Sequence, residues 1–348
     1  MPIVSWEPLQ AFVAEVMARL GCPPDEAEIV ARSLVGANLA GHDSHGVIRV
    51  EQYARMVRAG AIVPGAPLRV VQATPVTLLL DGGWNFGQVV ARRAMEQAIA
   101  RAHEWGASVV SVRHSNHVGR LGEYPLMAVE AGCLAIACVN NHGVGNLVAP
   151  YGGRQARLST NPIAIASPGP DGPILLDMTT SVVAEGKVRV RRNAGQPAPP
   201  GWLIDHLGQP TTDPNVLYRE PRGAILPFGG PVAHKAYGLA VMVDILAGAL
   251  SGGGCSQGKT GRLGNPIFFA VVAIERFVSR EEFLGQVRAL VEYVRSAPLA
   301  PGFSEILIPG EVEFREEARR RREGIPIDEE TWRQLVACAA ELGVAAPA

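Results

Sequence analysis

Residues 41–53 read Gly41-His42-Asp43-Ser44-His45-Gly46-Val47-Ile48-Arg49-Val50-Glu51-Gln52-Tyr53. This polar, glycine-bounded run lies between two segments whose apolar residues recur at helical spacing. Its first nine residues hold two imidazoles, a carboxylate, a hydroxyl and a guanidinium. A structural role alone does not require so many reactive groups, so we expect a functional site here.

The segments on both sides of this run predict helices. Residues 6–20 carry apolar side chains on one face, and residues 25–40 repeat the pattern and end at Gly41, which suits a helix C-terminus. A third helix is predicted from Gly46 to Arg58, with Ser44 acting either as its N-cap or as a contact to substrate.

The third helix also predicts a functional edge. His45, Arg49 and Tyr53 follow one another at intervals of four residues, so they share an edge that lies away from the apolar face. We expect the three side chains to line a cleft together.

The sequence after residue 64 alternates strand and helix patterns, which indicates an α/β fold. Polar loops follow two of the predicted strands: one loop contains Asn116 and His117, and the other contains Asn141 and His142. Ligands usually bind beyond the carboxyl ends of strands in such folds, so both loops are candidate parts of a site. Strands are expected at 76–80, 108–112, 134–139 and 267–274, and helices at 88–104, 121–131, 235–250, 280–295, 311–322 and 328–342.

The segment from residue 186 to 228 has a different texture. It is rich in proline and glycine and has few periodic positions, so we expect an ordered excursion instead of a repeat or a linker. The basic run from Lys187 to Arg192 is interpreted as a solvated strand or loop.

Composition excludes several classes of protein. The chain has 348 residues with 32 basic and 33 acidic side chains, so its net charge of −1 creates no field for nucleic acid or an anionic membrane. No window reaches the roughly 18 apolar residues of a membrane helix, and the N-terminus lacks a signal pattern, which favours the cytoplasm. The five scattered cysteines suggest neither a disulfide framework nor a zinc site.

Known chemical motifs are mostly missing. The nearest match to a Rossmann glycine turn, Gly143 to Val148, lacks the third glycine and is not followed by a predicted helix, so a classical Rossmann turn is not expected. The pairs His42/His45 and His114/His117 could hold zinc, but both lie in loops and no acidic residue recurs at ligand spacing. We therefore expect no metal.

Two further interpretations concern proton and acyl chemistry. Hydrolysis would need an activated serine, yet no G-x-S-x-G elbow is present. Acid–base chemistry fits better, because an imidazole titrates near neutral pH and a guanidinium binds a carboxylate in a bidentate manner. His45 or His117 would supply the first function and Arg49 the second.

A resemblance to a known family adds to this interpretation. The segments that carry it are GHDSHG (41–46) with Arg49, SNHVG (115–119), PYGG (150–153), TNP (160–162), DM (177–178), HKAYGL (234–239) and PGE (309–311). In this order they resemble the malate/L-lactate dehydrogenase type 2 family, which also includes ureidoglycolate and sulfolactate dehydrogenases, diketogulonate reductase and cyclic imino-acid reductases. The resemblance implies a non-Rossmann NAD(P)-binding α/β fold, a homodimer with its cleft near the subunit interface, and hydride transfer at the substrate's C2.

The resemblance also implies roles for individual residues. His45 and His117 match histidines that act as acid and base, and Arg49 matches a substrate-binding position. The expected further substrate contacts are Ser44, Tyr53, Asn116, Asn141 and His142, and the expected cofactor-binding residues are Thr160, Asn161, Pro162, Asp177, Met178, Thr179, His234, Lys235, Gly310 and Glu311.

The expected activity is therefore NAD- or NADP-dependent interconversion of a 2-oxo acid and a 2-hydroxy acid such as malate or lactate. A cyclic imino-acid reductase, a metal-dependent hydrolase or lyase, and a non-catalytic NAD(P)-binding protein are alternatives. For the domains, we expect residues 1–72 and 300–348 to form a helical substrate-side domain and residues 73–299 an α/β cofactor-binding domain. The sequence does not distinguish NAD from NADP.

Overall fold

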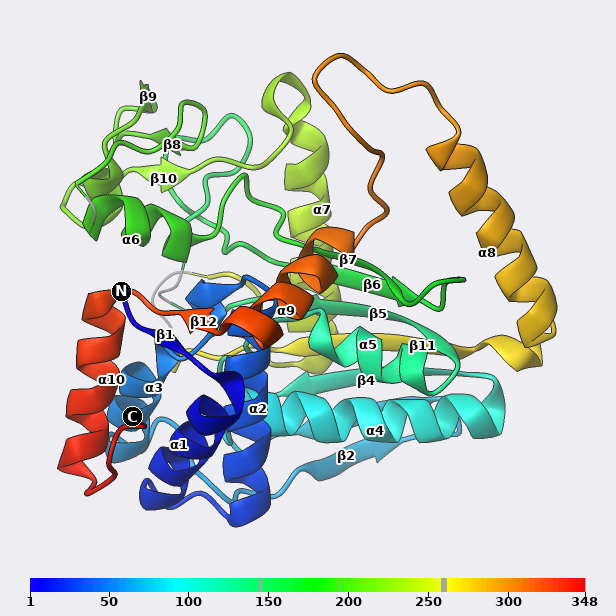
Figure 1. Ribbon diagram of the computed structural model, residues 1–348, viewed down its shortest axis with the longest axis horizontal. Coiled ribbons are helices and arrows are strands. Elements are labelled where there is room, and N and C mark those ends of the chain that lie inside the picture. The colour runs from blue at the N-terminus through cyan, green and yellow to red at the C-terminus, as the bar shows by residue number, and fades with distance from the viewer. Residues whose placement is uncertain (144–145, 194, 258–261, 348) are drawn as a thin grey trace.

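A seven-stranded mixed sheet lies at the centre of the computed structural model, which describes residues 1–143, 146–193, 195–257 and 262–347 (Figure 1). Strands β3 and β4 are parallel, and every other neighbouring pair in this sheet is antiparallel. The order is β2 (Arg69–Ala73), β3 (Thr77–Asp81), β4 (Ala107–Arg113), β11 (Ile267–Ala273), β5 (Cys133–Val139), β6 (Ile163–Ser167) and β7 (Ile174–Met178).

Helices cover both faces of this sheet. Helix α4 (Gly87–Trp105) packs on β4 and β11, and α5 (Glu123–Glu130) packs on β5 and β6. Helix α7 (His234–Asp244), continued by a π-helical turn at Ile245–Ala249, lies behind the sheet in Figure 1. Alternate residues of β11 are buried, as the period of two in a strand between two layers requires.

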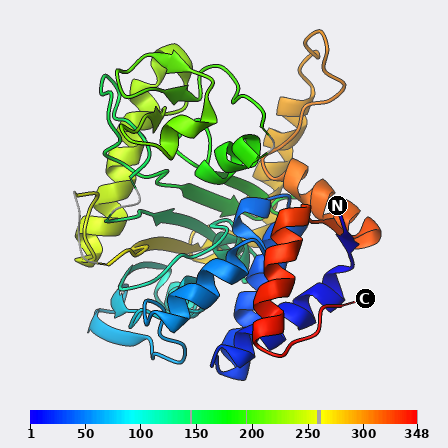
Figure 2. The same cartoon turned by 90° about the vertical axis from the view of Figure 1, so that its left-hand side faces the viewer.

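The two ends of the chain form a helical part together. Strand β1 (Ile3–Val4) pairs with β12 (Ile325–Pro326), and Figure 2 shows the first and last helices side by side. One apolar core joins their buried side chains, among them Leu9, Leu34, Val50 and Leu335. The helices of this part are α1 (Trp6–Arg19), α2 (Pro24–Leu39), α3 (Arg49–Arg58) and α10 (Glu329–Glu341).

A smaller lobe and a projecting arm complete the chain. The lobe, residues 181–228, has its own apolar core and a three-stranded sheet of β10 (Ala224–Ile225), β8 (Leu203–Ile204) and β9 (Pro210–Thr211), together with helix α6 (Glu185–Asn193). Helix α8 (Arg280–Arg295) stands away from the sheet in Figure 1, and the chain returns from it to α9 (Glu311–Glu323).

The structure confirms most of the predicted elements and the α/β class. The helices expected at 6–20, 25–40, 88–104, 235–250, 280–295 and 328–342 are present within a few residues, as are the predicted strands. The glycine turn at Gly143–Val148 includes residues 144–145, which lie outside the described residues. The division into two domains stays a prediction, and β2 places residues 69–72 in the sheet.

Two expectations were wrong. The third helix begins at Arg49 instead of Gly46, because the chain first makes a 3₁₀ turn at Asp43–His45 and is extended at Gly46; Ile48 is the N-cap and Ser44 is not. The basic run at 187–192 belongs to helix α6, not to a strand or loop. Its one buried residue, Val188, packs in the core of the lobe. Because one apolar residue is enough to hold this short helix, its sequence shows no periodic apolar pattern.

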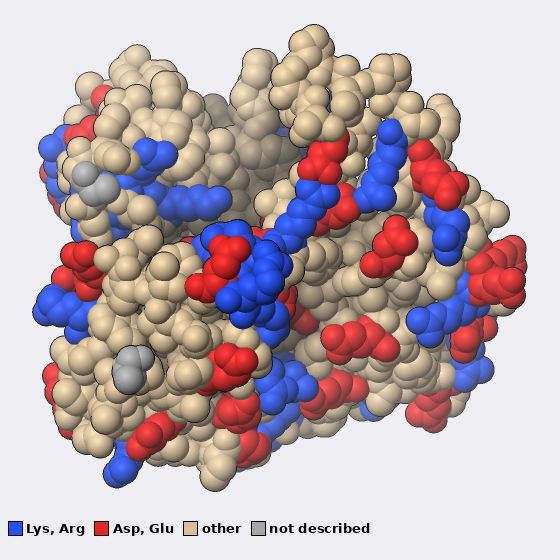
Figure 3. All heavy atoms as spheres, viewed as in Figure 1, with Lys and Arg blue, Asp and Glu red and all other residues tan. Residues whose placement is uncertain are grey.

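The surface and the helices agree with the composition. Acidic and basic side chains are interspersed on the face shown in Figure 3, where the densest group lies over the Arg- and Glu-rich helix α9. Among the described residues, no helix has the length and apolar character needed to cross a membrane.

Candidate active site

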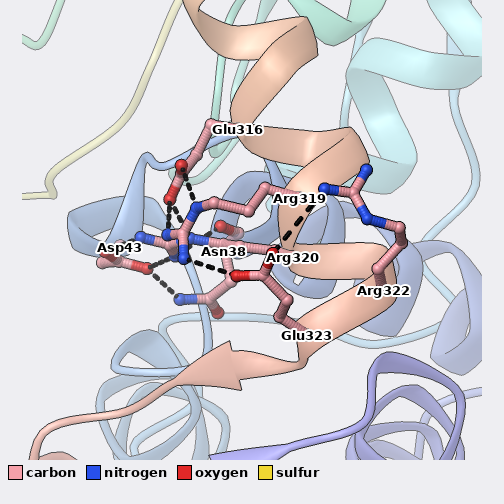
Figure 4. A network of polar contacts seen from close by, with 7 residues as sticks. All are labelled: Asn38, Asp43, Glu316, Arg319, Arg320, Arg322 and Glu323. Atoms are coloured by element: carbon pink, nitrogen blue, oxygen red, sulfur yellow. Dashed lines mark hydrogen bonds and ion pairs between the residues drawn. The ribbon is translucent and has the colours of Figure 1, made fainter.

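The run from Gly41 to Tyr53 is held in place by helix α9. The guanidinium of Arg320 donates to both carboxylate oxygens of Asp43, at 2.6 and 3.1 Å, and to the carbonyl of Asn38 at 2.6 Å (Figure 4). The Asn38 side chain in turn donates to Asp43 at 2.6 Å and accepts the Val47 amide at 2.9 Å. Asp43 is therefore an anchor of the run, not a reacting group.

Gly46 allows this anchoring. A Cβ atom at Gly46 would lie 2.1 Å from the Asn38 side-chain oxygen, so no other residue fits there without displacing Asn38. The turn at residues 43–45 is thus fixed by side chains from α2 and α9. The Asp43 carboxylate binds these side chains, Asn38 and Arg320.

Two histidines meet at the predicted cleft. The rings of His45 and His117 stack with centroids 5.5 Å apart and planes inclined by 12°. The Tyr53 hydroxyl lies 2.7 Å from Nδ1 of His117, and the Ser44 hydroxyl lies 3.1 Å from Nδ1 of His45. Segments that are far apart in the sequence therefore meet at this pair of histidines.

A buried glutamine supports this pair from behind. Gln88, at the start of α4, donates its amide to the Tyr53 hydroxyl at 2.7 Å. The phenol oxygen can accept a second hydrogen bond, from Nδ1–H of His117; in that tautomer Nε2 of the neutral ring carries no proton and can accept one. Gly87 allows α4 to begin here, because a Cβ would lie 2.2 Å from the Asn116 carbonyl.

Burial keeps both imidazoles neutral. Burial and the nearby Arg49 guanidinium lower the pKa of His45 to about 3, and the same causes hold the pKa of His117 well below its usual range. Burial raises the pKa of Tyr53 to about 12, so the phenol stays protonated. A neutral imidazole can accept a hydroxyl proton, which is the proton step in oxidation of an alcohol.

Arg49 is fixed at the same place with donors to spare. Its Nε donates to the Ser44 carbonyl at 2.8 Å and its Nη1 to Gln52 at 2.7 Å. These two contacts leave other N–H groups of the guanidinium for an anion. A planar cation beside two neutral imidazoles can bind a carboxylate and present the adjacent carbon to them.

Two predicted substrate contacts have structural partners instead. The Asn116 amide donates to the carbonyls of Ala61, Trp84 and Asn85 at 2.7 to 3.1 Å, so it braces the loop. His142 is buried edge-on against Trp84, with ring centroids 6.3 Å apart. Asn141 is partly exposed in the same loop. Their contact with substrate stays a prediction.

The predicted cofactor residues lie in four places. Asn161 is fully buried and donates to Asp244 at 3.1 Å and to the Ala240 carbonyl, and Pro162 leads from it into β6. Thr160 accepts the Thr180 hydroxyl through its carbonyl, and Thr179 donates to the Ser181 carbonyl. The third place is the N-terminus of α7, where His234 and Lys235 are exposed.

The fourth place is strand β7, which contains Asp177 and whose Leu175 packs against Gly310. Asp177, followed by Met178 at the end of β7, accepts the Gly122 amide at 2.9 Å. Gly310 has a φ of 96° and would bring a Cβ within 3.1 Å of Leu175, so glycine is required there. The Glu311 carboxylate already accepts from Arg295 and from the Ile308 amide, each at 2.6 Å.

Sequence reasoning missed several residues near the histidines. Gln88 had no motif to mark it, and Gly186 of α6 touches Ser44 from the separate lobe. Arg120 is 6% exposed and lies 3.5 Å from Asp177; its position three residues after His117 was the available signal.

The histidine pairs do not form a zinc site. His42 lies 3.9 Å from Glu313, whereas His114 contacts Asp81 at 2.9 Å. Within the described part of the chain, no three His, Cys, Asp or Glu residues are grouped as metal ligands. The arrangement fits proton transfer beside a cation that can bind a carboxylate, which is the chemistry that a 2-hydroxy acid dehydrogenase requires.

Comparison with known proteins assigns the family. The sequence profile of malate/L-lactate dehydrogenase matches residues 4–336, and the chain belongs to this family of NAD(P)-dependent 2-hydroxy acid dehydrogenases. It is 41% identical over 344 residues to malate dehydrogenase from Pyrococcus horikoshii, covering 97% of this chain and 94% of that protein. Membership in this family excludes the hydrolase, lyase and non-catalytic alternatives that the sequence left open.

Solved structures share the fold over almost the whole chain. Sulfolactate dehydrogenase from Methanocaldococcus jannaschii superposes with a TM-score of 0.89 at 35% identity, covering 99% of this chain and 98% of that one. The delta1-piperideine-2-carboxylate reductase from Pseudomonas syringae has a TM-score of 0.84 at 26% identity, covering 97% of this chain and all of that one.

Proposed function

We propose that this dehydrogenase interconverts a malate- or lactate-like 2-hydroxy acid and its 2-oxo acid, with His117 moving the hydroxyl proton. The observation that carries the proposal is the buried chain of contacts from Gln88 through Tyr53 to Nδ1 of His117. This chain fixes the orientation of His117, whereas His45 contacts only its neighbour Ser44 through Nδ1 among the described residues. His45, stacked on His117, completes the wall of the pocket.

Arg49 is proposed to hold the substrate carboxylate. Its contacts with the Ser44 carbonyl and Gln52 leave other N–H groups of the guanidinium for an anion, and a bidentate contact would orient the neighbouring C2 atom. When bound, NAD or NADP supplies or accepts the hydride at that carbon. Binding of an anionic carboxylate would also raise the pKa of both imidazoles, since it offsets the charge of Arg49.

The chain offers groups that suit such a cofactor. The exposed Lys235 provides a cation at the N-terminus of α7. A helix N-terminus also presents backbone N–H groups, and the two features together attract a phosphate. The Asn161 amide oxygen is buried without a partner among the described residues, which suits a hydrogen-bond donor on a ligand. We propose that these residues hold NAD or NADP together with the segments at Asp177 and Gly310, in a non-Rossmann manner.

One assay tests this function. Purified protein is mixed with NAD or NADP and a panel of malate, lactate and sulfolactate, and the absorbance of the reduced cofactor is followed. We expect turnover with at least one of these acids, and a His117→Gln variant should lose at least about a hundredfold in kcat. No turnover with any acid and either cofactor would overturn the proposal; wild-type kcat in His117→Gln would overturn the assignment of the proton to His117.

A second candidate is reduction of a cyclic imino acid. It is favoured by the similarity to the piperideine-2-carboxylate reductase structure, and the same cation and imidazoles could orient a ring carboxylate and its C=N bond. Adding piperideine-2-carboxylate and NADPH to the panel separates the two. A higher kcat/KM for the imine than for every oxo acid would favour this candidate.

The chain is further proposed to form a homodimer through the projecting arm. Helix α8 and the segment after it expose large apolar side chains, with Leu290 60%, Tyr293 78% and Phe303 69% exposed. An apolar surface of this kind on a helix that stands apart from the body suits burial against a second copy. Sedimentation should give a dimer for the wild type and a monomer for Tyr293→Glu; a monomeric wild type would contradict the proposal.

A further inference from the structure

Helix α6 of the small lobe lies against the active-site run at Gly186. A Cβ atom built on Gly186 would lie 2.4 Å from the Cβ of Ser44 and 3.4 Å from its hydroxyl. Real Cβ atoms do not approach so closely, so any other residue at 186 must displace Ser44 or tilt the helix. The first turn of α6 is therefore in direct van der Waals contact with the turn that carries His45.

Ser44 transmits this contact to two functional side chains. Its hydroxyl lies 3.1 Å from Nδ1 of His45, and its carbonyl accepts Nε of Arg49 at 2.8 Å. A shift of Ser44 would rotate the His45 ring and move the cation that is proposed to bind the carboxylate. No other described contact joins His45 Nδ1 to the protein.

The helix itself is firmly held in this position. Val188 is fully buried in the core of the lobe, and the Glu185 carboxylate is clamped by the Tyr218 hydroxyl at 2.6 Å and by Arg189 at 2.6 and 3.1 Å. Burial raises the pKa of Glu185, but these hydrogen bonds and the charge of Arg49 outweigh burial and lower it overall. The Glu185 carboxylate close to Arg49 is therefore ionised. The lobe thus presents a rigid edge to the active-site run.

We propose that α6 is a positioning element of the active site, and that Gly186 allows it to seat against Ser44 and so fix His45 and Arg49. The inference rests on the proposed function for its kinetic consequence, because His45 and Arg49 are assigned there. The contact itself is independent of that assignment. Residue 186 would act through Ser44 and would not touch the substrate.

The test is Gly186→Ala, compared with Gly36→Ala as a matched control. Gly36 is also inside a helix, α2, but a Cβ there meets nothing within 4 Å. A displacement of about 1 Å at reacting groups can cost a hundredfold in rate, so we expect kcat of Gly186→Ala to fall by about ten- to a hundredfold while KM for the cofactor changes less than about threefold. Gly36→Ala should keep wild-type kinetics.

A double variant shows whether the effect passes through Ser44. Ser44→Gly removes the Cβ that the methyl group introduced by Gly186→Ala would strike, so adding Gly186→Ala to Ser44→Gly should lower kcat by less than about twofold further. The same large loss in both backgrounds would overturn the proposal, since the new methyl group would then act by another route. Wild-type kcat in Gly186→Ala alone would also overturn it.

A spectroscopic measurement keeps the two proposals separable. In protein labelled with ¹⁵N-histidine, and with the His45 signals assigned from a His45→Gln variant, Gly186→Ala should shift the His45 imidazole resonances and Gly36→Ala should not. If the wild type turns over no 2-hydroxy acid, the proposed function fails while this shift still decides the contact. Unchanged His45 resonances in Gly186→Ala would refute the positioning role.

Discussion

Replacing Arg320 with methionine removes the cation that connects the active-site run to helix α9. The Arg320 side chain is 9% exposed and binds Asp43, the Asn38 carbonyl and Glu316, the last at 2.5 Å (Figure 4). Methionine keeps the aliphatic volume but none of the donors. The substitution therefore tests the polar contacts with little change in packing.

The expected magnitude follows from the exposure of the partners. Removing one member of a fully buried ion pair costs about 3–5 kcal/mol, because the other charge is left without a partner. Here the Asp43 side chain is 50% exposed and Glu316 26%, so water can solvate both carboxylates after the loss. We therefore expect the free energy of unfolding to fall by about 2 kcal/mol, less than for a fully buried pair. The turn at 43–45 would loosen, so kcat/KM should fall by about tenfold or more.

Urea unfolding followed by circular dichroism and steady-state kinetics on one preparation measure both effects. Arg322→Met is the matched control, because Arg322 is on the same helix, is 69% exposed and lies 3.6 Å from Glu323. It should change the unfolding free energy by less than about 0.5 kcal/mol and leave kcat/KM unchanged. If Arg320→Met has the same urea midpoint and kcat/KM as this control, the anchoring role of Arg320 is refuted.

Three further predictions concern the site and the pH dependence of stability. Tyr53→Phe removes the hydroxyl that orients His117, so kcat should fall by about ten- to a hundredfold with cofactor KM retained, and unchanged kcat would show that Nδ1 of His117 needs no partner. Arg49→Lys should raise substrate KM by at least about tenfold without changing cofactor binding by fluorescence, because an ammonium lacks the planar fork; an unchanged KM would remove Arg49 from the carboxylate site. Burial raises the pKa of Glu123 from 4.5 to about 7, so the native state keeps a proton that the unfolded chain loses, and this contribution to stability is present below pH 4.5 and lost as the pH rises to about 7. The unfolding free energy of the wild type relative to Glu123→Gln should accordingly fall between pH 4.5 and 7; a flat difference would refute the protonated carboxyl.

Periodicity predicted the regular elements because their burial pattern is local. Helices α1, α2 and α4 each bury one face against a single core, so apolar residues recur at helical spacing in the sequence itself. Helix α6 gave no such signal, since Val188 is its only buried residue among those described. The third helix begins three residues later than its spacing predicts, at Arg49, because the backbone is extended at Gly46. The i, i+4 spacing of His45 and Arg49 carries no information about the conformation of that glycine.

The candidate site could be predicted only in part for a related reason. The i, i+4 spacing grouped His45, Arg49 and Tyr53, and the position of its loop after a predicted strand made His117 a candidate, to which the resemblance added support. The contact between Arg320 and Asp43 spans 277 residues of sequence and has no local pattern. The contacts of Gln88 with Tyr53, which spans 35 residues, and of Gly186 with Ser44 also have no local pattern, and a glycine that is needed for close approach looks like any other glycine.

The arrangement of these long-range contacts has a functional consequence. The turn at 43–45 has no apolar side chain that is fully buried, so its own sequence cannot hold it rigid. It is instead fixed by side-chain contacts from α2 and α9, by the seat of α6, and through Tyr53 by α4. Side chains that line a reacting site must be held within fractions of an ångström, and a loop reaches that precision only through such supports. We therefore expect substitutions at supports distant in sequence to lower kcat as strongly as changes beside the substrate, and to do so while the sheet and its cofactor-side residues keep their structure.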